Sequence, residues 1–111
     1  MINHCFKRLS FCTWNINGIN SKLIGDKTKC VDFLNQVTKH DFIILTETWS
    51  TSVPKVEGYN CISLDIKYPK KNKRISGGIS LLYKECYKNK VELVKSSNNS
   101  LWCSIEKHSV Y

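Results

Sequence analysis

The sequence predicts an α/β fold, and three observations along its first half carry that prediction. An apolar segment of strand length, Arg8 to Trp14, is followed by a segment with helical periodicity and then by a continuous apolar segment, Phe42 to Leu45. A strand, a helix and a strand in this order indicate a crossover between two parallel strands of one sheet. At 111 residues the chain has the length of one domain or of part of one.

The first strand is expected over Arg8 to Trp14, and the helix over about residues 25 to 39. Asp26 near the start of the helix and Lys39 near its end suit the helix dipole. Four apolar residues are spaced i, i+3, i+4 and i+7 and would form its buried face: Cys30, Phe33, Leu34 and Val37.

The second strand, Phe42 to Leu45, runs into the polar residues Thr46, Glu47 and Thr48. Because both strands of a crossover end at the same edge of the sheet, Asn15 and Glu47 are expected to lie close together.

The rest of the chain reads mostly as strands. They are expected at Gly58 to Ile66, at Gly77 to Lys84, at Val91 to Val94 and at Leu101 to His108, with a turn at Lys95 to Ser100. Gly77 and Gly78 at the entry to a strand indicate a close backbone approach or a bulge.

Charge and cysteine content narrow the class of protein. A net charge of +8 attracts polyanions such as nucleic acid or an anionic membrane surface. No segment has the roughly 18 consecutive apolar residues of a membrane span, and the start of the chain lacks a signal-peptide core. We therefore expect no membrane partner and a nuclear or cytoplasmic location.

Four of the six cysteines lie in apolar patterns typical of buried free thiols: Cys12, Cys30, Cys61 and Cys103.

The polar residues after the two strands have the chemistry of a magnesium site. Three asparagines, Asn15, Asn17 and Asn20, surround Gly18, and Glu47 is expected beside them. Mg²⁺ takes one or two carboxylates and completes its octahedron with water and substrate phosphate. An asparagine amide can also donate to a phosphate oxygen without adding charge.

Three segments, "TWNINGINSK", "DFIILTETW" and "SGGISLLYK", resemble the first half of the endonuclease/exonuclease/phosphatase family, which includes deoxyribonuclease I. The forms "NINGINSK" and "TETW" are most similar to the endonuclease domain of non-LTR (LINE-type) retrotransposons. The resemblance implies the N-terminal half of a two-sheet α/β sandwich that cleaves DNA phosphodiesters with Mg²⁺ or Mn²⁺. It implies catalytic and metal-binding roles for Asn15 and Glu47, and phosphate binding supported by Asn17.

The later motifs of that family have no counterpart in this sequence. These are a tyrosine at an "IYAP"-like strand end, a Gly-Asp-x-Asn segment and a terminal Ser-Asp-His, which supply the groups that activate water. We therefore expect residues 1–111 to be one partial domain, truncated at its C-terminus and inactive alone, with an apolar sheet face and strand edges exposed. In the intact protein a downstream reverse transcriptase domain is the partner that the resemblance implies.

A basic segment, "KYPKKNKR", carries five cations in eight residues: Lys67, Lys70, Lys71, Lys73 and Arg74. Three interpretations of this segment stay open: a contact to DNA phosphates, a solvated loop, or a nuclear-import patch.

Two other functions of the chain also stay open: a non-catalytic nucleic-acid-binding remnant, and a phosphatase of the same fold acting on a small phosphoester. Among the tryptophans, Trp14 and Trp102 are expected in the core and Trp49 near the substrate.

Overall fold

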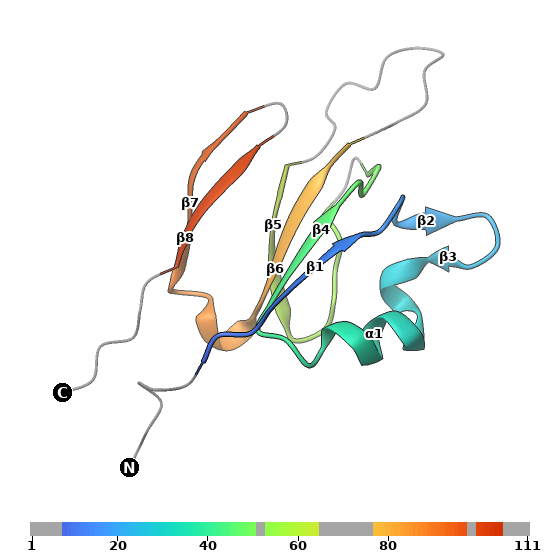
Figure 1. The fold of residues 1–111 in the computed structure, drawn as a ribbon, viewed down its shortest axis with the longest axis horizontal. Coiled ribbons are helices and arrows are strands. Elements are labelled where there is room, and N and C mark those ends of the chain that lie inside the picture. Colours follow the sequence, from blue (N-terminus) through green and yellow to red (C-terminus); the bar gives the residue numbers. More distant parts are fainter. Residues whose placement is uncertain (1–7, 51–52, 65–76, 98–99, 106–111) are drawn as a thin grey trace.

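The computed structural model describes residues 8–50, 53–64, 77–97 and 100–105. They form a small mixed α/β domain made mostly of strands, with one α-helix in this part of the chain (Figure 1). The central sheet has four strands in the order β1 (Phe11–Asn15), β4 (Phe42–Thr46), β6 (Ile79–Lys84) and β5 (Tyr59–Leu64). The sheet is mixed, because β1 is parallel to β4 while β6 is antiparallel to both of its neighbours.

The predicted crossover between the first two strands is confirmed. Phe11 lies opposite Phe42 and Asn15 lies opposite Thr46, so the two strands end at the same edge of the sheet. The first strand was expected to end at Trp14 and instead includes Asn15, which places the start of the asparagine cluster on the sheet itself.

The helix is shorter than expected. Residues predicted to be its first turns form a small strand, β3 (Gly25–Asp26), and a 3-10 turn, η2 (Lys27–Lys29), and α1 covers only Val31–Val37. The two helical pieces are separated because Cys30 has an extended backbone, with φ −73° and ψ 139°. Asp26 caps the 3-10 turn through its side chain, which accepts a hydrogen bond from the Thr28 backbone N–H at 2.9 Å.

A short hairpin that the sequence did not predict precedes this turn. Strand β2 (Asn20–Ser21) pairs with β3, and the hairpin projects from the body of the domain at the right of Figure 1. Its tip is open to solvent, with 96% of Leu23 exposed.

Two apolar clusters lie on opposite faces of the central sheet. On one face, Phe33 and Val37 of α1 pack with Ile43, Leu45 and Leu82. The predicted helix face is confirmed by this packing, to which Cys30 and Leu34 also contribute.

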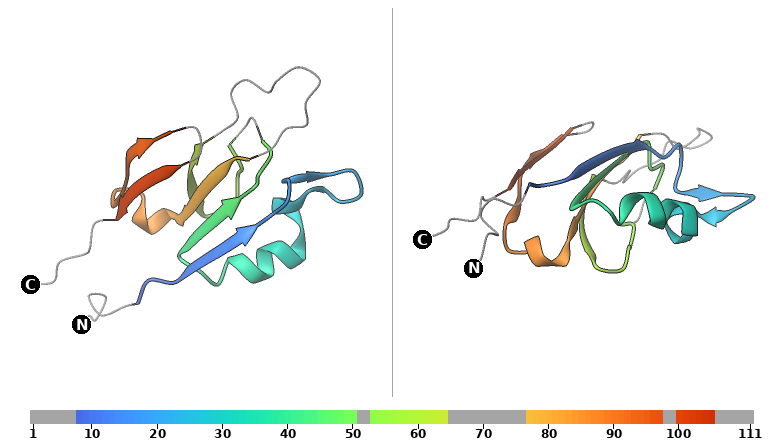
Figure 2. Two further views of the ribbon diagram at one scale, coloured as in Figure 1. Left: turned by 45° about the horizontal axis from the view of Figure 1, so that its top comes forward. Right: turned by 60° about the horizontal axis from the view of Figure 1, so that its bottom comes forward.

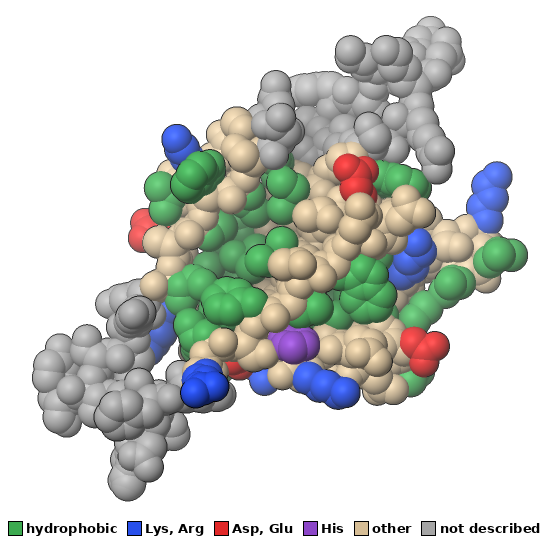
Figure 3. Space-filling model, viewed as in Figure 1, with side chains coloured by type: hydrophobic (Ala, Val, Ile, Leu, Met, Phe, Trp, Pro, Cys, Tyr) green, Lys and Arg blue, Asp and Glu red, His purple; other side chains and the backbone are tan. Residues whose placement is uncertain are grey.

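On the other face, Phe42, Leu81 and Tyr83 form the second cluster. The hairpin of β7 (Val91–Ser96) and β8 (Leu101–Ile105) packs against it, after a 3-10 turn, η3 (Glu85–Tyr87) (Figure 2). The hairpin covers this face only in part, since Phe11 stays 49% exposed although its ring stacks on Phe42 at 4.8 Å between centroids. Figure 3 shows hydrophobic side chains at the surface between this hairpin and the rest of the sheet.

Several sequence predictions in the second half need correction. Strand β7 runs to Ser96, into the segment predicted to be a turn. Trp102 was expected in the core, but it lies on the outer side of the hairpin with 57% of its surface exposed. Lys95 Nζ lies over the Trp102 ring, 5.3 Å from its centroid. The segments 65–66 and 106–108, expected to end two strands, lie outside the described residues.

The cysteines described by the structure are free thiols. The four expected to be buried are partly buried, and Cys86 on η3 is exposed. Burial raises the pKa of the Cys12 and Cys103 thiols, which keeps both protonated at neutral pH. Cys5 lies outside the described residues. Over the part of the chain described, no helix is long and apolar enough to cross a membrane.

A polar cluster fixes the start of β1 and β4, opposite the edge where the asparagines lie. The Ser10 backbone N–H donates to Asp41 Oδ2 at 2.9 Å, and Lys84 Nζ lies 3.6 Å from Asp41 Oδ1. The Ser10 hydroxyl and His40 Nδ1 are 2.5 Å apart. These contacts hold the register of the parallel pair and therefore the relative position of the two strand ends.

Candidate functional site at the ends of β1 and β4

The candidate site consists of two loops that leave the same edge of the sheet, and they are named here the asparagine loop (residues 15–18) and the glutamate loop (residues 46–49). Their backbones are hydrogen-bonded along their length. The Ile16 N–H donates to the Thr46 carbonyl at 3.0 Å, and the Gly18 N–H donates to the Glu47 carbonyl at 2.7 Å. The parallel pairing therefore continues past the strands, and it brings the predicted site residues into neighbouring positions.

Asn15 and Asn17 of the asparagine loop are exposed, whereas Ile16 and Gly18 are buried, and the Asn15 side chain folds back on the loop. Asn15 Oδ1 accepts a hydrogen bond from the Asn17 backbone N–H at 3.1 Å, which forms an Asx turn. Asn17 adopts a left-handed backbone conformation, with φ 52°. Asn20 belongs to β2 and is exposed, so it lies on the neighbouring hairpin and outside this loop.

Glu47 is partly exposed, and two donors converge on one of its oxygens. The Trp49 indole N–H donates to Glu47 Oε2 at 2.6 Å, and the Gly77 backbone N–H donates to the same oxygen at 3.1 Å. The Trp49 indole and then the Gly77 amide lower the pKa of Glu47 by stabilising its charged form. The carboxylate is therefore ionised at neutral pH.

Backbone strain gathers in these two loops. Of the described residues other than glycine, three have a positive φ, and all three lie here: Asn17 at 52°, Glu47 at 53° and Trp49 at 51°. The left-handed conformation costs an L-residue about 1–2 kcal/mol, and asparagine tolerates it better than glutamate or tryptophan. Strain of this kind is typical of functional sites, where the position of a side chain matters more than local stability.

Lys27 holds the asparagine loop from the side of η2. Its Nζ donates to the Ile16 carbonyl at 2.9 Å and to the Asn17 carbonyl at 3.2 Å. Sequence reasoning missed this role, because Lys27 was placed in the first turn of a helix. No pattern in the sequence signals a lysine that binds backbone carbonyls ten and eleven residues away.

The donors at this edge fit a magnesium ion only in part. In the described ranges no group of three or more histidine, cysteine, aspartate or glutamate side chains could hold a metal. The edge offers one ionised carboxylate, Glu47, and the amide oxygen of Asn15, which has a second lone pair beyond its bond to Asn17. Mg²⁺ accepts such a sparse protein set when waters and a phosphate complete its shell.

The basic segment cannot be placed beside this edge. Lys67, Lys70, Lys71, Lys73 and Arg74 lie outside the described residues, so their assignment to DNA binding stays a prediction from the sequence.

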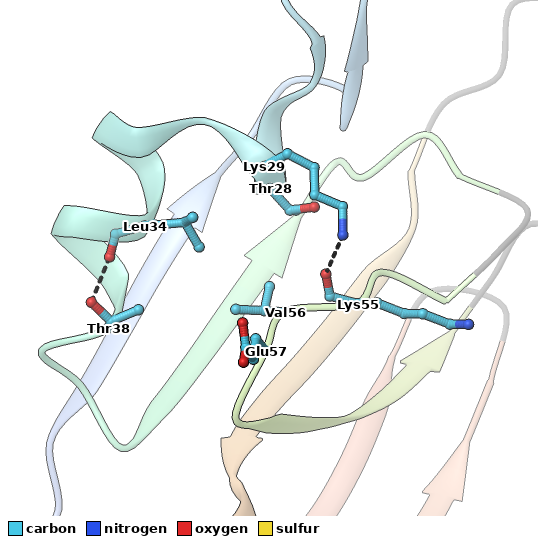
Figure 4. A pocket seen from close by; sticks show the side chains of 7 residues that line it. All are labelled: Thr28, Lys29, Leu34, Thr38, Lys55, Val56 and Glu57. Carbon is cyan, nitrogen blue, oxygen red and sulfur yellow. Dashed lines mark hydrogen bonds between the residues drawn. The ribbon is translucent and has the colours of Figure 1, made fainter.

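A separate pocket lies on the helix side of the sheet (Figure 4). It is formed between α1 and the segment that precedes β5, and Lys29 Nζ donates across it to the Lys55 carbonyl at 3.5 Å. Thr28, Val56 and Glu57 also line it, and none of the predicted site residues does. Sequence reasoning did not find this pocket, since its walls come from segments 26 residues apart without a shared motif.

Comparison with known proteins adds no assignment: no family model, no curated protein and no solved structure matches the chain.

Proposed function

We propose that the chain is the N-terminal part of a Mg²⁺-dependent DNA endonuclease domain of the retrotransposon type, within the endonuclease/exonuclease/phosphatase family. The observation that carries this proposal is the pairing of the asparagine loop with the glutamate loop at the common end of two parallel strands. The two motifs that carry the resemblance are thereby neighbours in space, although about 30 residues separate them in the sequence. The proposed fold is half of a two-sheet sandwich, with the β7–β8 hairpin beginning to cover the second face of the central sheet.

Each residue of the site has a proposed role. Glu47 would hold Mg²⁺, or Mn²⁺ in its place, together with the amide oxygen of Asn15. Asn15 and Asn17 would orient the scissile phosphate by donating from their amides, which add no charge. Such a metal, when bound, polarises the phosphoryl oxygen and stabilises the leaving alkoxide.

Water activation is the part of the reaction for which these residues offer no group. It requires a base near the attacking water. The aspartate and histidine motifs that carry this role in the family have no counterpart in this sequence. We therefore expect the 111-residue chain to show no appreciable nicking of supercoiled plasmid in Mg²⁺. Mg²⁺-dependent nicking that Glu47→Ala abolishes would show this expectation to be wrong.

Cation binding tests the proposal directly. Mn²⁺ added to the ¹⁵N-labelled chain should broaden the amide signals of Asn15, Asn17 and Glu47 first, and excess Mg²⁺ should restore them. Glu47→Gln should abolish this local broadening, whereas Glu92→Gln, which neutralises an exposed glutamate on β7, should leave it unchanged. Broadening that is uniform over the surface, or indifferent to Glu47→Gln, would refute a cation site at this edge.

A non-catalytic nucleic-acid-binding function is the second candidate, and the net charge of +8 favours it. It predicts DNA binding that weakens steeply with salt, is indifferent to Mg²⁺ and survives Glu47→Ala. Fluorescence anisotropy with a labelled duplex at two salt concentrations, with and without Mg²⁺, separates it from the first proposal. The choice of DNA over a small phosphoester rests on the motifs and on this charge.

A further inference from the structure

The glutamate loop, which carries Trp49, is held from two sides by the chain around the site. The Trp49 backbone N–H donates to the Gly77 carbonyl at 2.9 Å, and the preceding Thr48 N–H donates to the Gly78 carbonyl at 3.3 Å. These bonds tie the glutamate loop to the start of β6 on one side, while the Glu47 carbonyl ties it to the asparagine loop on the other. The loop is fixed between two neighbours, so the strained backbone of Glu47 and Trp49 cannot relax independently.

The indole ring lies directly over Gly18. A Cβ built on Gly18 would come within 2.4 Å of Trp49 Cε3 and 3.0 Å of Cζ3, which leaves no room for any other residue there. Gly18 has φ 87°, which glycine adopts without strain. The glycine of the asparagine loop therefore provides a flat backbone surface on which the ring rests.

The ring in this position presents its N–H to Glu47. At 2.6 Å the hydrogen bond to Oε2 is short and charge-assisted, and the Gly77 amide adds a second donor to the same atom. Both donors act on Oε2, so the carboxylate is held by one oxygen and cannot rotate freely. Among the described residues, the contacts of the carboxylate are both to Oε2, so the other oxygen, Oε1, is the one that we assign to a ligand.

We propose that Trp49 is a positioning residue that immobilises Oε2 of Glu47, so that the carboxylate offers Oε1 alone to a divalent cation. The ligand part of this inference rests on the proposed function, whereas the positioning part rests on the contacts alone. Residues that hydrogen-bond to a metal ligand orient it, and their loss typically lowers metal affinity about 10- to 100-fold.

The test compares Trp49→Phe with Trp102→Phe. Phenylalanine keeps an aromatic ring next to Gly18 but removes the N–H donor and part of the indole's bulk, and Trp102→Phe makes the same change at an exposed tryptophan on β8, so it serves as the matched control. Mn²⁺ affinity is measured by the broadening of the Glu47 amide signal. We expect Trp49→Phe to weaken it about 10-fold or more, and Trp102→Phe to leave it unchanged. Equal affinity for wild type and a folded Trp49→Phe would overturn the proposal.

A second readout needs neither metal nor a change at Trp49. In the ¹⁵N spectrum of the metal-free chain, the indole N–H of Trp49 should exchange with solvent more slowly than that of Trp102. Glu47→Gln should move the Trp49 indole signal and leave the Trp102 signal in place. An indole signal that exchanges rapidly and ignores Glu47→Gln would overturn the positioning role even if Trp49→Phe failed to fold.

The two readouts separate this inference from the proposed function. If the wild-type chain binds no Mn²⁺, the cation site and the role assigned to Oε1 both fail. A protected indole N–H that responds to Glu47→Gln would then still support the positioning of the carboxylate by Trp49.

Discussion

Replacing Gly78 with alanine is expected to destabilise the domain strongly, because this position is constrained by both its backbone and its surroundings. Gly78 has φ 96°, outside the range that side chains normally allow. A Cβ at Gly78 would lie 2.2 Å from Thr48 Oγ1 and 3.4 Å from the Trp49 backbone nitrogen. Thr48 is 1% exposed, so its side chain cannot turn out into solvent to avoid the added methyl.

The loss of stability expected for Gly78→Ala is the sum of two separate costs. The left-handed backbone costs an alanine about 1–2 kcal/mol, and forcing an extra methyl into a packed site costs about 1–3 kcal/mol. Their sum predicts a loss of about 2–5 kcal/mol in the free energy of unfolding. Gly58→Ala is the matched control, since Gly58 has φ 84° but a Cβ there would meet nothing within 4 Å. It should cost only the backbone share, about 1–2 kcal/mol.

Urea unfolding of the two variants measures the difference through the shift in midpoint at constant m-value. Thr48→Ala removes the clashing oxygen, so Gly78→Ala should cost less in that background than in the wild type, which a double-mutant cycle detects. If Gly78→Ala and Gly58→Ala cost the same, the close approach of the glutamate loop to β6 does not exist and the packing described here is wrong.

Two further predictions concern the charged groups of the site. The pKa of Glu47, followed by carboxyl-carbon NMR, should lie below the usual value for glutamate. Its stabilising contribution is present above the pKa of the unfolded chain and is lost as the pH falls through the folded pKa, a dependence that Glu47→Gln should remove. Lys27→Met should cost about 1–2 kcal/mol, since it removes a charged donor to two carbonyls of the asparagine loop. Lys29→Met, which removes one long contact from an exposed lysine, should cost much less, and equal costs would contradict the role given to Lys27.

The parts of the fold that follow from apolar periodicity could be predicted from the sequence. The continuous segment beginning at Phe42 is a central strand with its side chains buried on both faces. Phe33 and Val37 of the expected helix face are buried against it, and the crossover places Asn15 beside the end of the second strand. These features depend on which residues are apolar and on the order of elements, both of which the sequence displays.

Features that depend on single backbone angles or on distant packing could not be predicted. The helix is interrupted by the extended backbone of Cys30, although Cys30 matches the helical period. The β2–β3 hairpin has strands of only two residues, too short to show an alternation. Trp102 is exposed because the register of β8 turns Leu101 and Cys103 toward the core, a choice that the apolar segment alone leaves undetermined.

The candidate site also has a part that could be predicted from the sequence and a part that could not. The neighbourhood of Asn15 and Glu47 follows from topology and was predicted, whereas the bond from Trp49 to Glu47 was not. In an ordinary extended strand, residues two apart point to the same face but do not fold back on each other. The indole reaches the carboxylate because Glu47 and Trp49 both have a positive φ. Neither residue type favours that conformation, so the sequence does not predict it.

The location of this strain bears on function. A loop that only had to connect β4 to the next segment could place glycine at both left-handed positions, which would remove about 1–2 kcal/mol of strain at each. The chain keeps glutamate and tryptophan there, and it offsets their cost with backbone bonds to Gly18 and Gly77. Strained residues stabilised by surrounding hydrogen bonds are expected where their side chains are needed in fixed positions. An ionised carboxylate held by an indole beside an asparagine loop is a defined chemical feature, and it is the part of the molecule where a loss of function should be separable from a loss of stability.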